Sequence, residues 1–346
     1  MKTGTVSVVM PTYNHARYVR AAIASVLAQT HRELELVVVD NHSTDGTAEC
    51  VHGFHDARVR YFTFRNNGVI AASRNFGARQ ARGEFIAFLD SDDAWAPEKL
   101  ERQVAAFPDE RVALVASGAW IVEEDRVGRR EFVGVSRRGF KEYSYTEVLK
   151  RSPVITSAVV VRRSAFVEAG GFDESPDFVC VEDYDLWLRI ARLGVVRVIG
   201  APLIYYRVHA DPSRDRVTET ERGLGVLEKH VRLGYLADAA VLNNARGAIY
   251  LGMARLALEI DVRASRDYHR KAFRLSGELA AKCKAALGYA STFLPASRRR
   301  AVVGVLARGR GWAYEGLERV WARARRRTTV ARDSDSASSS IGSATG

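Results

Sequence analysis

A short apolar run that ends in a cluster of acids constrains this chain most. Residues Phe85–Leu89 are all apolar, and all but Ala87 are bulky, which is typical of a strand buried inside a sheet. Three carboxylates follow, on Asp90, Asp92 and Asp93. Carboxylates at the end of a buried strand are costly unless positive charge lies among them. We therefore expect a ligand site here, because ligands bind at the carboxyl ends of strands in open α/β sheets.

A hard divalent cation is the natural partner of these acids. Mg²⁺ and Mn²⁺ prefer carboxylate oxygens and often bind a substrate phosphate at the same time. The alternative is that Asp92 or Asp93 is the N-cap of a helix suggested by Pro97 and its neighbours. One cap accounts for a single carboxylate, so the three acids together favour a metal site.

The sequence before this cluster alternates between strand and helix patterns. Runs rich in β-branched and apolar residues predict strands at 5–10, 34–39, 59–64 and 85–89. Apolar residues at helical spacing predict helices at 16–29, from about 47, and at 69–82. This alternation is typical of an α/β fold with a mostly parallel sheet flanked by helices. The strand ends at Pro11, Asp40 and Asp90 should therefore meet at one edge of the sheet.

The patterns after residue 110 are less regular. We expect strands at 112–117, 120–122, 154–161, 195–199 and 203–208, and a polar, irregular segment at 123–145. Short helices are expected from Arg163 to Gly170 and from Glu182 to Ala191. The second helix begins with Glu182 and Asp183. A helix dipole favours acids in the first turn, so a structural explanation for these two residues stays open.

The composition changes near Thr218, where Ala, Leu and Arg replace Gly and β-branched residues. We therefore divide the 346 residues into an α/β domain at 1–215, a basic α-helical region at 216–330 and a disordered tail at 331–346. The tail is rich in Ser, Ala and Gly and has little to bury. Within the helical region, 244–259 and 264–275 have the pattern of an antiparallel helix pair.

The chain is strongly basic, with a formal net charge of +11. Nucleic acid, an anionic membrane surface, an anionic substrate or simply a solvated basic surface would each account for this charge. The three cysteines have neither metal-type nor disulfide-type spacing, which suggests a reducing compartment. The N-terminus has no signal-peptide pattern, and no apolar stretch approaches the ~20 residues of a membrane span. We therefore predict a cytoplasmic protein.

Five motifs, in this order, resemble those of the family 2 glycosyltransferases, which have the GT-A fold. They are the opening strand and Pro-x-Tyr-Asn turn at Val8–Asn14, the Asn-x-Gly…Arg-Asn-x-Gly helix at Asn66–Gly77, the Asp-x-Asp motif at Phe88–Asp93, the acceptor-side loop at Gly170–Glu174 and the Glu-Asp motif at Glu182–Arg189. Each motif alone is weak, but the order and the separations are specific. The resemblance covers roughly residues 5–210.

The loop after the second predicted strand departs from the family pattern. The family commonly has Asp-Asp-Gly-Ser-x-Asp, whereas this chain has Asp40-Asn41-His42-Ser43-Thr44-Asp45. The first and last acids are kept, while Asn41 replaces the second acid and His42 replaces the glycine. The change bears on the geometry of this loop and on the choice of nucleotide base, and the fold does not depend on it.

The resemblance implies a nucleotide-diphosphate sugar as donor, with a UDP-sugar as the first choice. Asp40 is then expected to accept a hydrogen bond from the base, unless it only caps the next helix. Arg74 and Asn75 would orient the donor near the diphosphate, or Arg74 would form an ion pair on a helix surface. Asp90 would bind ribose or sugar hydroxyls. The remaining residues implied at the donor site are Pro11, Tyr13, Asn14, Asn41, Asp45, Ser91 and Arg207.

The resemblance also implies a metal and a catalytic base. Asp92, with Asp90 and His209, would hold Mg²⁺ or Mn²⁺, which neutralises the diphosphate as it leaves. Asp183 is the expected base for the acceptor hydroxyl, with Glu182 second. Direct displacement with one base inverts the anomeric centre. A lone histidine such as His209 is, alternatively, an ordinary polar surface residue.

The leading interpretation is an inverting, metal-dependent glycosyltransferase of cell-surface polysaccharide or glycolipid synthesis. It would act on a carbohydrate, glycolipid or other hydroxyl acceptor, with a possible peripheral contact to the anionic inner face of the membrane. One alternative is a nucleotidyltransferase, but Pro11–Asn14 is not its Gly-rich, lysine-bearing phosphate loop. Another is a basic nucleic-acid-binding protein, but the arginine clusters lack interleaved aromatic residues. The oligomeric state does not follow from the sequence.

Overall fold

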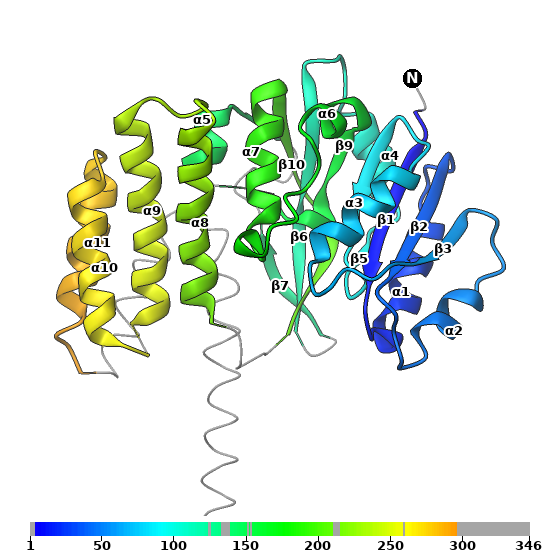
Figure 1. Cartoon of the computed structure of the whole chain (residues 1–346), viewed down its shortest axis with the longest axis horizontal. Coiled ribbons are helices and arrows are strands. Elements are labelled where there is room, and N and C mark those ends of the chain that lie inside the picture. Colours follow the sequence, from blue (N-terminus) through cyan, green and yellow to red (C-terminus); the bar gives the residue numbers. More distant parts are fainter. Residues whose placement is uncertain are drawn as a thin grey trace, which may run out of the picture.

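The structure is a computed structural model that describes residues 4–123, 126–132, 139–150, 152, 154–209, 215–258 and 260–295. Within these residues, ten strands form one sheet with helices on its faces, and four further helices stand beyond it (Figure 1). The order of the sheet is β3-β2-β1-β4-β9-β6-β10-β5, with β7 paired to β6 and β8 to β10.

Four parallel strands form the half of the sheet that begins the chain. They are β1 (Val6–Thr12), β2 (Leu34–Asp40), β3 (Val59–Thr63) and β4 (Phe85–Phe88). The connecting helices are α1 (Ala16–Leu27), α2 (Thr47–His52) and α3 (Ile70–Gln80). Thr12 lies opposite Asp40 in the ladder of β1 and β2, and the amide of Leu89 donates to the carbonyl oxygen of Val9 at 3.1 Å. The ends of these strands therefore lie along one edge, as predicted.

The other half of the sheet is mixed. Its strands are β5 (Ala94–Trp95), β6 (Val112–Glu123), β7 (Arg126–Phe132), β8 (Phe140–Tyr143), β9 (Val160–Arg162) and β10 (Val195–Val208). Only β6 and β10 are parallel here, while β9 runs antiparallel to both of its neighbours, β4 and β6. The predicted parallel arrangement therefore holds for the first four strands, and the sheet as a whole is mixed.

Several predicted elements of this half were wrong. The segment 123–145 contains β7, β8 and the start of α5 (Tyr145–Lys150) instead of being irregular. Each of these two strands pairs with a single neighbour, and three of the four residues of β8 are exposed, so its sequence lacks the apolar run of a buried strand. The strand predicted at 154–161 is only β9, preceded by the 3-10 turn η1 (Thr156–Ala158). Two short strands were predicted within 112–122 and two within 195–208, but each range forms one long strand, β6 and β10.

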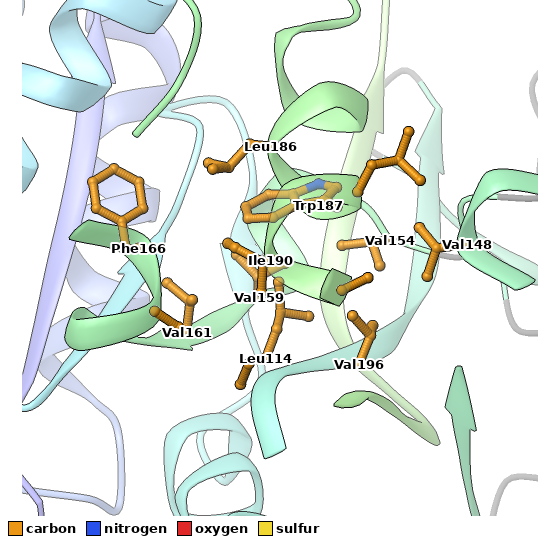
Figure 2. Close-up of a cluster of buried hydrophobic side chains, with 14 of the residues drawn as sticks. Leu114, Val148, Val154, Val159, Val161, Phe166, Leu186, Trp187, Ile190 and Val196 are labelled. Atoms are coloured by element: carbon orange, nitrogen blue, oxygen red, sulfur yellow. The ribbon is translucent and has the colours of Figure 1, made fainter. Parts of the chain in front are cut away.

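Large hydrophobic clusters cover both faces of the sheet. Alternate residues of β1 point to opposite faces, so Val9 belongs to one cluster while Val8 and Met10 belong to the other. Trp187 is fully buried in the first cluster, together with Leu186 and Ile190 (Figure 2). Its ring lies 5.8 Å from that of Phe172. This cluster lies under helix α7 (Glu182–Leu193), so packing on the sheet fixes the position of the helix that begins with the two predicted catalytic acids.

The shorter helices and turns between the strands are α4 (Lys99–Val104), α6 (Arg163–Glu168) and η2 (Pro176–Phe178). The helical region then comprises α8 (Arg216–Arg232), α9 (Ala239–Ala257), α10 (Val262–Leu275) and α11 (Leu279–Ser291), and α9 with α10 confirms the predicted helix pair. These helices stand beyond α7, at the end of the molecule opposite β3 (Figure 1). Among the described helices, none is long and apolar enough to cross a membrane. The predicted tail at 331–346 lies outside the described residues.

The helical region is joined to the rest by a shared core and a buried charge network. Leu227 of α8 is fully buried in the same cluster as Trp187. The Asp185 carboxylate of α7 accepts from Lys229 at 2.8 Å and lies 3.2 Å from the ring of His230. The predicted boundary at 215/216 falls at Asp215, which caps α8. Whether the two parts are separate domains stays a prediction.

Leu227→Ala tests this boundary. Removing a fully buried leucine should lower the free energy of unfolding by about 2–5 kcal/mol. Because the core is continuous, we expect one cooperative transition in urea that shifts as a whole, followed by circular dichroism and tryptophan fluorescence. The control Leu287→Ala changes an exposed side chain and should have an effect within about 0.5 kcal/mol. Two separated transitions, with only one of them shifted, would instead show independent domains.

Candidate active site

Two of the three acids after β4 meet a basic side chain, and the third meets a backbone amide. The Asp90 carboxylate accepts from Arg74 at 2.7 Å, and that of Asp92 lies 2.7 Å from Nε2 of His209. The Asp93 carboxylate accepts from the backbone amide of Arg207 at 2.7 Å. Partners from α3 and from the end of β10 thus offset part of the cost of placing three carboxylates at a buried strand end.

Asp92 and Asp93 have opposite protonation preferences. Burial alone would raise the pKa of Asp92, but the hydrogen bond with His209 and the charges of His15 and His209 lower it. Burial raises the pKa of Asp93 well above its usual range, and the neighbouring charges of Asp92 and Asp90 raise it further. Asp92 is therefore the charged member of the pair. Asp93 is 2% exposed and attaches the strand end to β10.

Arg74 joins the strand end to helix α7. One nitrogen of its guanidinium donates to Asp90 and another to Glu182, both at 2.7 Å. The side chain is buried, and although burial alone would lower its pKa, the charges of Asp90 and Glu182 raise it. The alternative of an ion pair on a helix surface is therefore wrong, because this pair is internal. The predicted contact of Arg74 with the diphosphate remains a prediction.

Asp183 differs from Glu182 in its partners. Its carboxylate accepts from the hydroxyl of Thr156 at 2.9 Å and from the amide of Tyr184 at 2.7 Å. Burial raises the pKa of Asp183 to about 6, and the charge of Glu182 acts in the same direction. A carboxyl group with such a pKa is suited to accept a proton near neutral pH. Glu182, in contrast, is bound to Arg74, so of the two acids Asp183 is the better base.

The carboxylate of Asp40 lies at the end of β2 and is 1% exposed. One oxygen accepts from the amide and the hydroxyl of Ser43, at 2.9 and 2.6 Å, and the other accepts from the hydroxyl of Tyr61 at 2.6 Å. Asp40 therefore holds its own loop, where the sequence alternative was a helix cap. A carboxylate oxygen can accept more than one hydrogen bond, so the predicted contact with a base stays a prediction.

A cavity of about 340 Å³ lies beside this loop. Its lining residues are Tyr13, Asn41, His42, Arg65 and Asn67. Tyr13 is 55% exposed, so it does not serve as core packing. Pro11 is buried in β1 beneath the loop. Two of the residues predicted at the donor, Tyr13 and Asn41, thus share one hollow at the edge of the sheet.

His42 shows why the family prefers glycine at its position. Its φ angle is +58°, in the left-handed region that glycine enters without steric cost. A residue with a Cβ loses about 1–2 kcal/mol there relative to its preferred conformations. The loop therefore places a residue with a Cβ in a conformation that glycine adopts more readily.

Asn14 and Asp45 connect the two loops at this edge. The side-chain oxygen of Asn14 accepts from the amide of Thr44 at 2.8 Å. One oxygen of Asp45 accepts from the amide of Ala16 at 2.9 Å, and the other accepts from the Thr47 hydroxyl at 2.5 Å. Both side chains thus hold the start of α1 against the loop before α2. Their predicted role at the donor stays a prediction, and their contacts are within the protein.

Asn75 faces away from the strand end and toward the loop after α6. Its amide nitrogen donates to the carbonyl oxygen of Phe172 and to Glu174, both at 2.8 Å, and its oxygen accepts from the amide of Phe172 at 2.9 Å. A Cβ on Gly171 would lie 2.7 Å from that oxygen, which explains the glycine. Asn75 therefore fixes the loop resembling the family's acceptor-side loop, and it lines a second cavity, of about 610 Å³.

His15 and Tyr18 also lie at this site, although the sequence analysis did not predict them. Nδ1 of His15 lies 2.8 Å from the hydroxyl of Ser91, and the ring of Tyr18 lies 5.5 Å from that of His209. The guanidinium of Arg207 lies 4.7 Å from the centre of the Tyr18 ring. Both residues stand at the start of α1, where the helical pattern explains them without a functional role. Only the contact with the strand end distinguishes them.

The donor set at the strand end suits a divalent cation that a substrate helps to hold. Among the described residues, no three His, Cys, Asp or Glu side chains converge as metal ligands. Asp92 and His209 are paired and partly exposed, whereas Asp90 points to Arg74. Mg²⁺ is commonly bound by one or two carboxylates together with substrate phosphates, so a protein pair of ligands fits. The metal itself stays a prediction.

Comparison with known proteins identifies the family. The sequence profile described as Glycosyl transferase family 2 matches residues 7–170. The UDP-Glc:alpha-D-GlcNAc-diphosphoundecaprenol beta-1,3-glucosyltransferase WfgD of Escherichia coli is 31% identical over 245 residues, which cover 68% of this chain and 92% of that protein. The chain belongs to glycosyl transferase family 2. A nucleotidyltransferase and a nucleic-acid-binding protein, the two alternatives from the sequence, are not supported.

Other relatives extend beyond the matched region. An uncharacterized glycosyltransferase of Rickettsia felis is 30% identical over 234 residues, and the match covers 64% of this chain and 37% of that protein. The chain thus spans about a third of the length of this relative, whereas it spans most of the length of WfgD.

Solved structures confirm the GT-A fold. S. aureus TarS 1-349 in complex with UDP-GlcNAc has a TM-score of 0.60 and 19% identity, and the match covers 86% of this chain and 92% of that one. The mannosyltransferase PcManGT of Pyrobaculum calidifontis, in complex with GDP-Man and Mn2+, has a TM-score of 0.54 and 20% identity, over 90% and 88%. This chain therefore shares its fold with both of these solved structures.

Arg74→Met should lower the free energy of unfolding by about 3–5 kcal/mol, because it leaves two internal carboxylates without their cation. Replacing the partner as well, in Arg74→Met with Glu182→Met, should restore part of this loss. Urea denaturation measures both. The control Arg111→Met breaks a pair whose arginine side chain is 83% exposed, and should leave the unfolding curve nearly unchanged. If the effect of the double variant equals the sum of the effects of Arg74→Met and Glu182→Met made singly, the bridging role of Arg74 is contradicted.

Proposed function

We propose that this protein is an inverting glycosyltransferase that moves a sugar from a UDP-sugar to a hydroxyl group of a lipid-linked or polysaccharide acceptor. The name of WfgD supports the donor and the acceptor class, because it describes transfer from UDP-Glc to a sugar on diphosphoundecaprenol. A relative from Bacillus subtilis named for teichuronic acid biosynthesis supports a role in cell-surface polymers. The TarS complex with UDP-GlcNAc supports the nucleotide.

Asp183 carries the proposed mechanism. Its carboxylate takes the proton of the acceptor hydroxyl, and the acceptor oxygen forms a bond to the anomeric carbon of the donor. The bond from that carbon to the diphosphate breaks on the opposite face, so the configuration inverts and UDP leaves. The raised pKa, to about 6, and the hydrogen bonds from Thr156 and Tyr184 support this role, because they orient a carboxylate that binds a proton readily.

The donor is proposed to lie along the edge formed by β1, β2 and β4. The nucleoside enters the 340 Å³ cavity beside Tyr13 and Asn41, and the base contacts Asp40. Asp90 binds a ribose or sugar hydroxyl with the carboxylate oxygen that Arg74 leaves accessible; its side chain is 28% exposed. Arg207 lies next to Asp92 and supplies positive charge near the diphosphate.

A Mg²⁺ or Mn²⁺ ion is proposed at Asp92 and His209. When bound, it would supply positive charge to the diphosphate leaving group. Asp92 keeps its negative charge because His209 lowers its pKa, and His209 presents a ring nitrogen at the same point. Two arginine side chains of the protein itself, those of Arg74 and Arg207, also supply positive charge near this pair.

Thermal unfolding in a panel of nucleotide sugars tests the donor and the metal. A UDP-sugar should raise the melting temperature in the presence of Mn²⁺ or Mg²⁺, because a ligand of the native state stabilises it. Asp92→Ala should abolish the part of the shift that depends on metal. Asp177→Ala, which removes an exposed acid of η2, is the matched control and should leave the shift intact. Equal stabilisation with and without metal would rule out the proposed ion.

The pH dependence of kcat/KM tests the base. Asp183 must be deprotonated to accept a proton, so kcat/KM should fall as the pH drops below about 6 and level off above it. Asp183→Asn should lower kcat by roughly 10²–10⁴-fold with little change in donor binding. Asp177→Asn should retain both the rate and the profile. An unchanged acid limb in the Asp183→Asn variant would assign the titration to another group.

A further inference from the structure

Helix α11 is apolar on two opposite sides. Its inner side, with Ala285 and Ser291, is buried against the neighbouring helices. Its outer side carries Leu279, which is 77% exposed, and Leu287, which is 53% exposed. Phe293, just past the end of the helix, is 60% exposed. A helix that is apolar all round normally lies inside a core, so the outer side calls for a cover.

The exposed residues form one continuous stripe. Leu279, Cys283, Ala286, Leu287 and Ala290 follow each other at helical spacing and are all exposed. We call these residues, together with Phe293, the outer stripe. In Figure 1, α10 and α11 stand at the extreme end of the molecule, away from the strand ends of the active site. No described residue covers the stripe, since each of its members is exposed.

Positive charge surrounds this stripe. Between 262 and 293 the chain has seven basic residues and two acids. The basic residues are Arg263, Arg266, Arg270, Lys271, Arg274, Lys282 and Lys284. Lys282 and Lys284 flank the stripe on either side, and Arg266 stacks on Phe293 at 4.0 Å. Long basic side chains beside an apolar stripe can extend their charges to the level of lipid headgroups while the stripe enters the acyl boundary.

We propose that the outer stripe of α11 is a peripheral docking surface for an anionic lipid bilayer. Its apolar residues would enter the interface, and the surrounding lysines and arginines would contact the headgroups. The inference adds a surface to the proposed function, because an acceptor linked to a lipid is presented at a membrane. It assigns membrane contact to a folded element with named residues instead of to net charge alone.

The positive charge around the outer stripe argues against two other partners that could cover it, a second copy of this chain and the segment that follows α11. A second copy docking through the same stripe would bring the seven basic residues of each copy together, and like charges across an interface cost affinity. The following part of this chain, 296–327, has ten arginines and two glutamates, so as a cover it would meet the same repulsion. An anionic surface has the charge that complements both the seven basic residues around the stripe and the arginine-rich segment 296–327.

Flotation with lipid vesicles tests the surface on the full chain. At physiological salt, the protein should float with vesicles of phosphatidylcholine and phosphatidylglycerol and remain below with phosphatidylcholine alone. Leu279→Ser with Leu287→Ser and Phe293→Ser keeps every charge and should lower partitioning by about tenfold or more. The control Val167→Ser with Leu193→Ser and Phe140→Ser changes equally exposed apolar residues elsewhere and should not alter partitioning.

A fluorescent probe shows whether the stripe itself enters the bilayer. With Cys50→Ser and Cys180→Ser, an environment-sensitive dye on Cys283 should shift to the blue when anionic vesicles are added. The matched control carries Cys50→Ser and Cys283→Ser and has the dye on Cys180, which is also exposed and should show no shift. The vesicles contain neither donor nor acceptor, so neither result depends on catalysis.

Three results would overturn the proposal. Unchanged flotation of the triple serine variant would assign binding to the arginines beyond residue 295. An unshifted dye on Cys283 in bound protein would exclude insertion of the stripe. A dimer that dissociates in the triple serine variant, without any binding to vesicles, would assign the stripe to a second copy.

Discussion

The guanidinium of Arg74 is the interaction on which this active site depends. Asp90 and Glu182 come from segments far apart in the sequence, and both place an oxygen 2.7 Å from a nitrogen of the same buried side chain. Without a cation between them, a strand end and a helix start that each carry acids would repel. The pair of contacts therefore fixes α7 relative to β4, and with it the distance between the donor edge and the proposed base.

Three acids of α7 have three different environments, because neighbouring positions on a helix face different directions. Glu182 meets Arg74, while Asp183 meets Thr156, and burial together with the charge of Glu182 raises the pKa of Asp183 although the charge of Arg74 lowers it. Asp185 faces the helical region, where His230, Arg189 and Lys229 outweigh the effect of burial and lower its pKa. Environments that push the pKa values of adjacent carboxyl groups apart are the usual means of separating a base from structural acids.

The sequence predicted those parts of the fold that depend on continuous local patterns. Strands β1, β2 and β4 are almost wholly buried, so their apolar runs, and the acids that follow β2 and β4, could be recognised in the sequence. The edge strand β8 was missed, because its residues are mostly exposed and its ladder with β10 depends on a partner more than fifty residues away. The same limit applies to the site. Nothing near Asn75 in the sequence indicates that its amide would bind Phe172 and Glu174.

The positions of His42 and Asn75 show what a motif conveys in this family. His42 stands where the family commonly has glycine, and its backbone is in the left-handed conformation. The contacts of Asp40 with Ser43 and Tyr61 hold the loop in this conformation. At Asn75 the residue type was kept, and its contacts are with the loop that closes over the end of α3. A motif residue can therefore mark a position that shapes the backbone around a ligand. At this edge of the sheet, the side chains of Asp90, Asp92 and His209 are partly exposed, so a substrate could contact them.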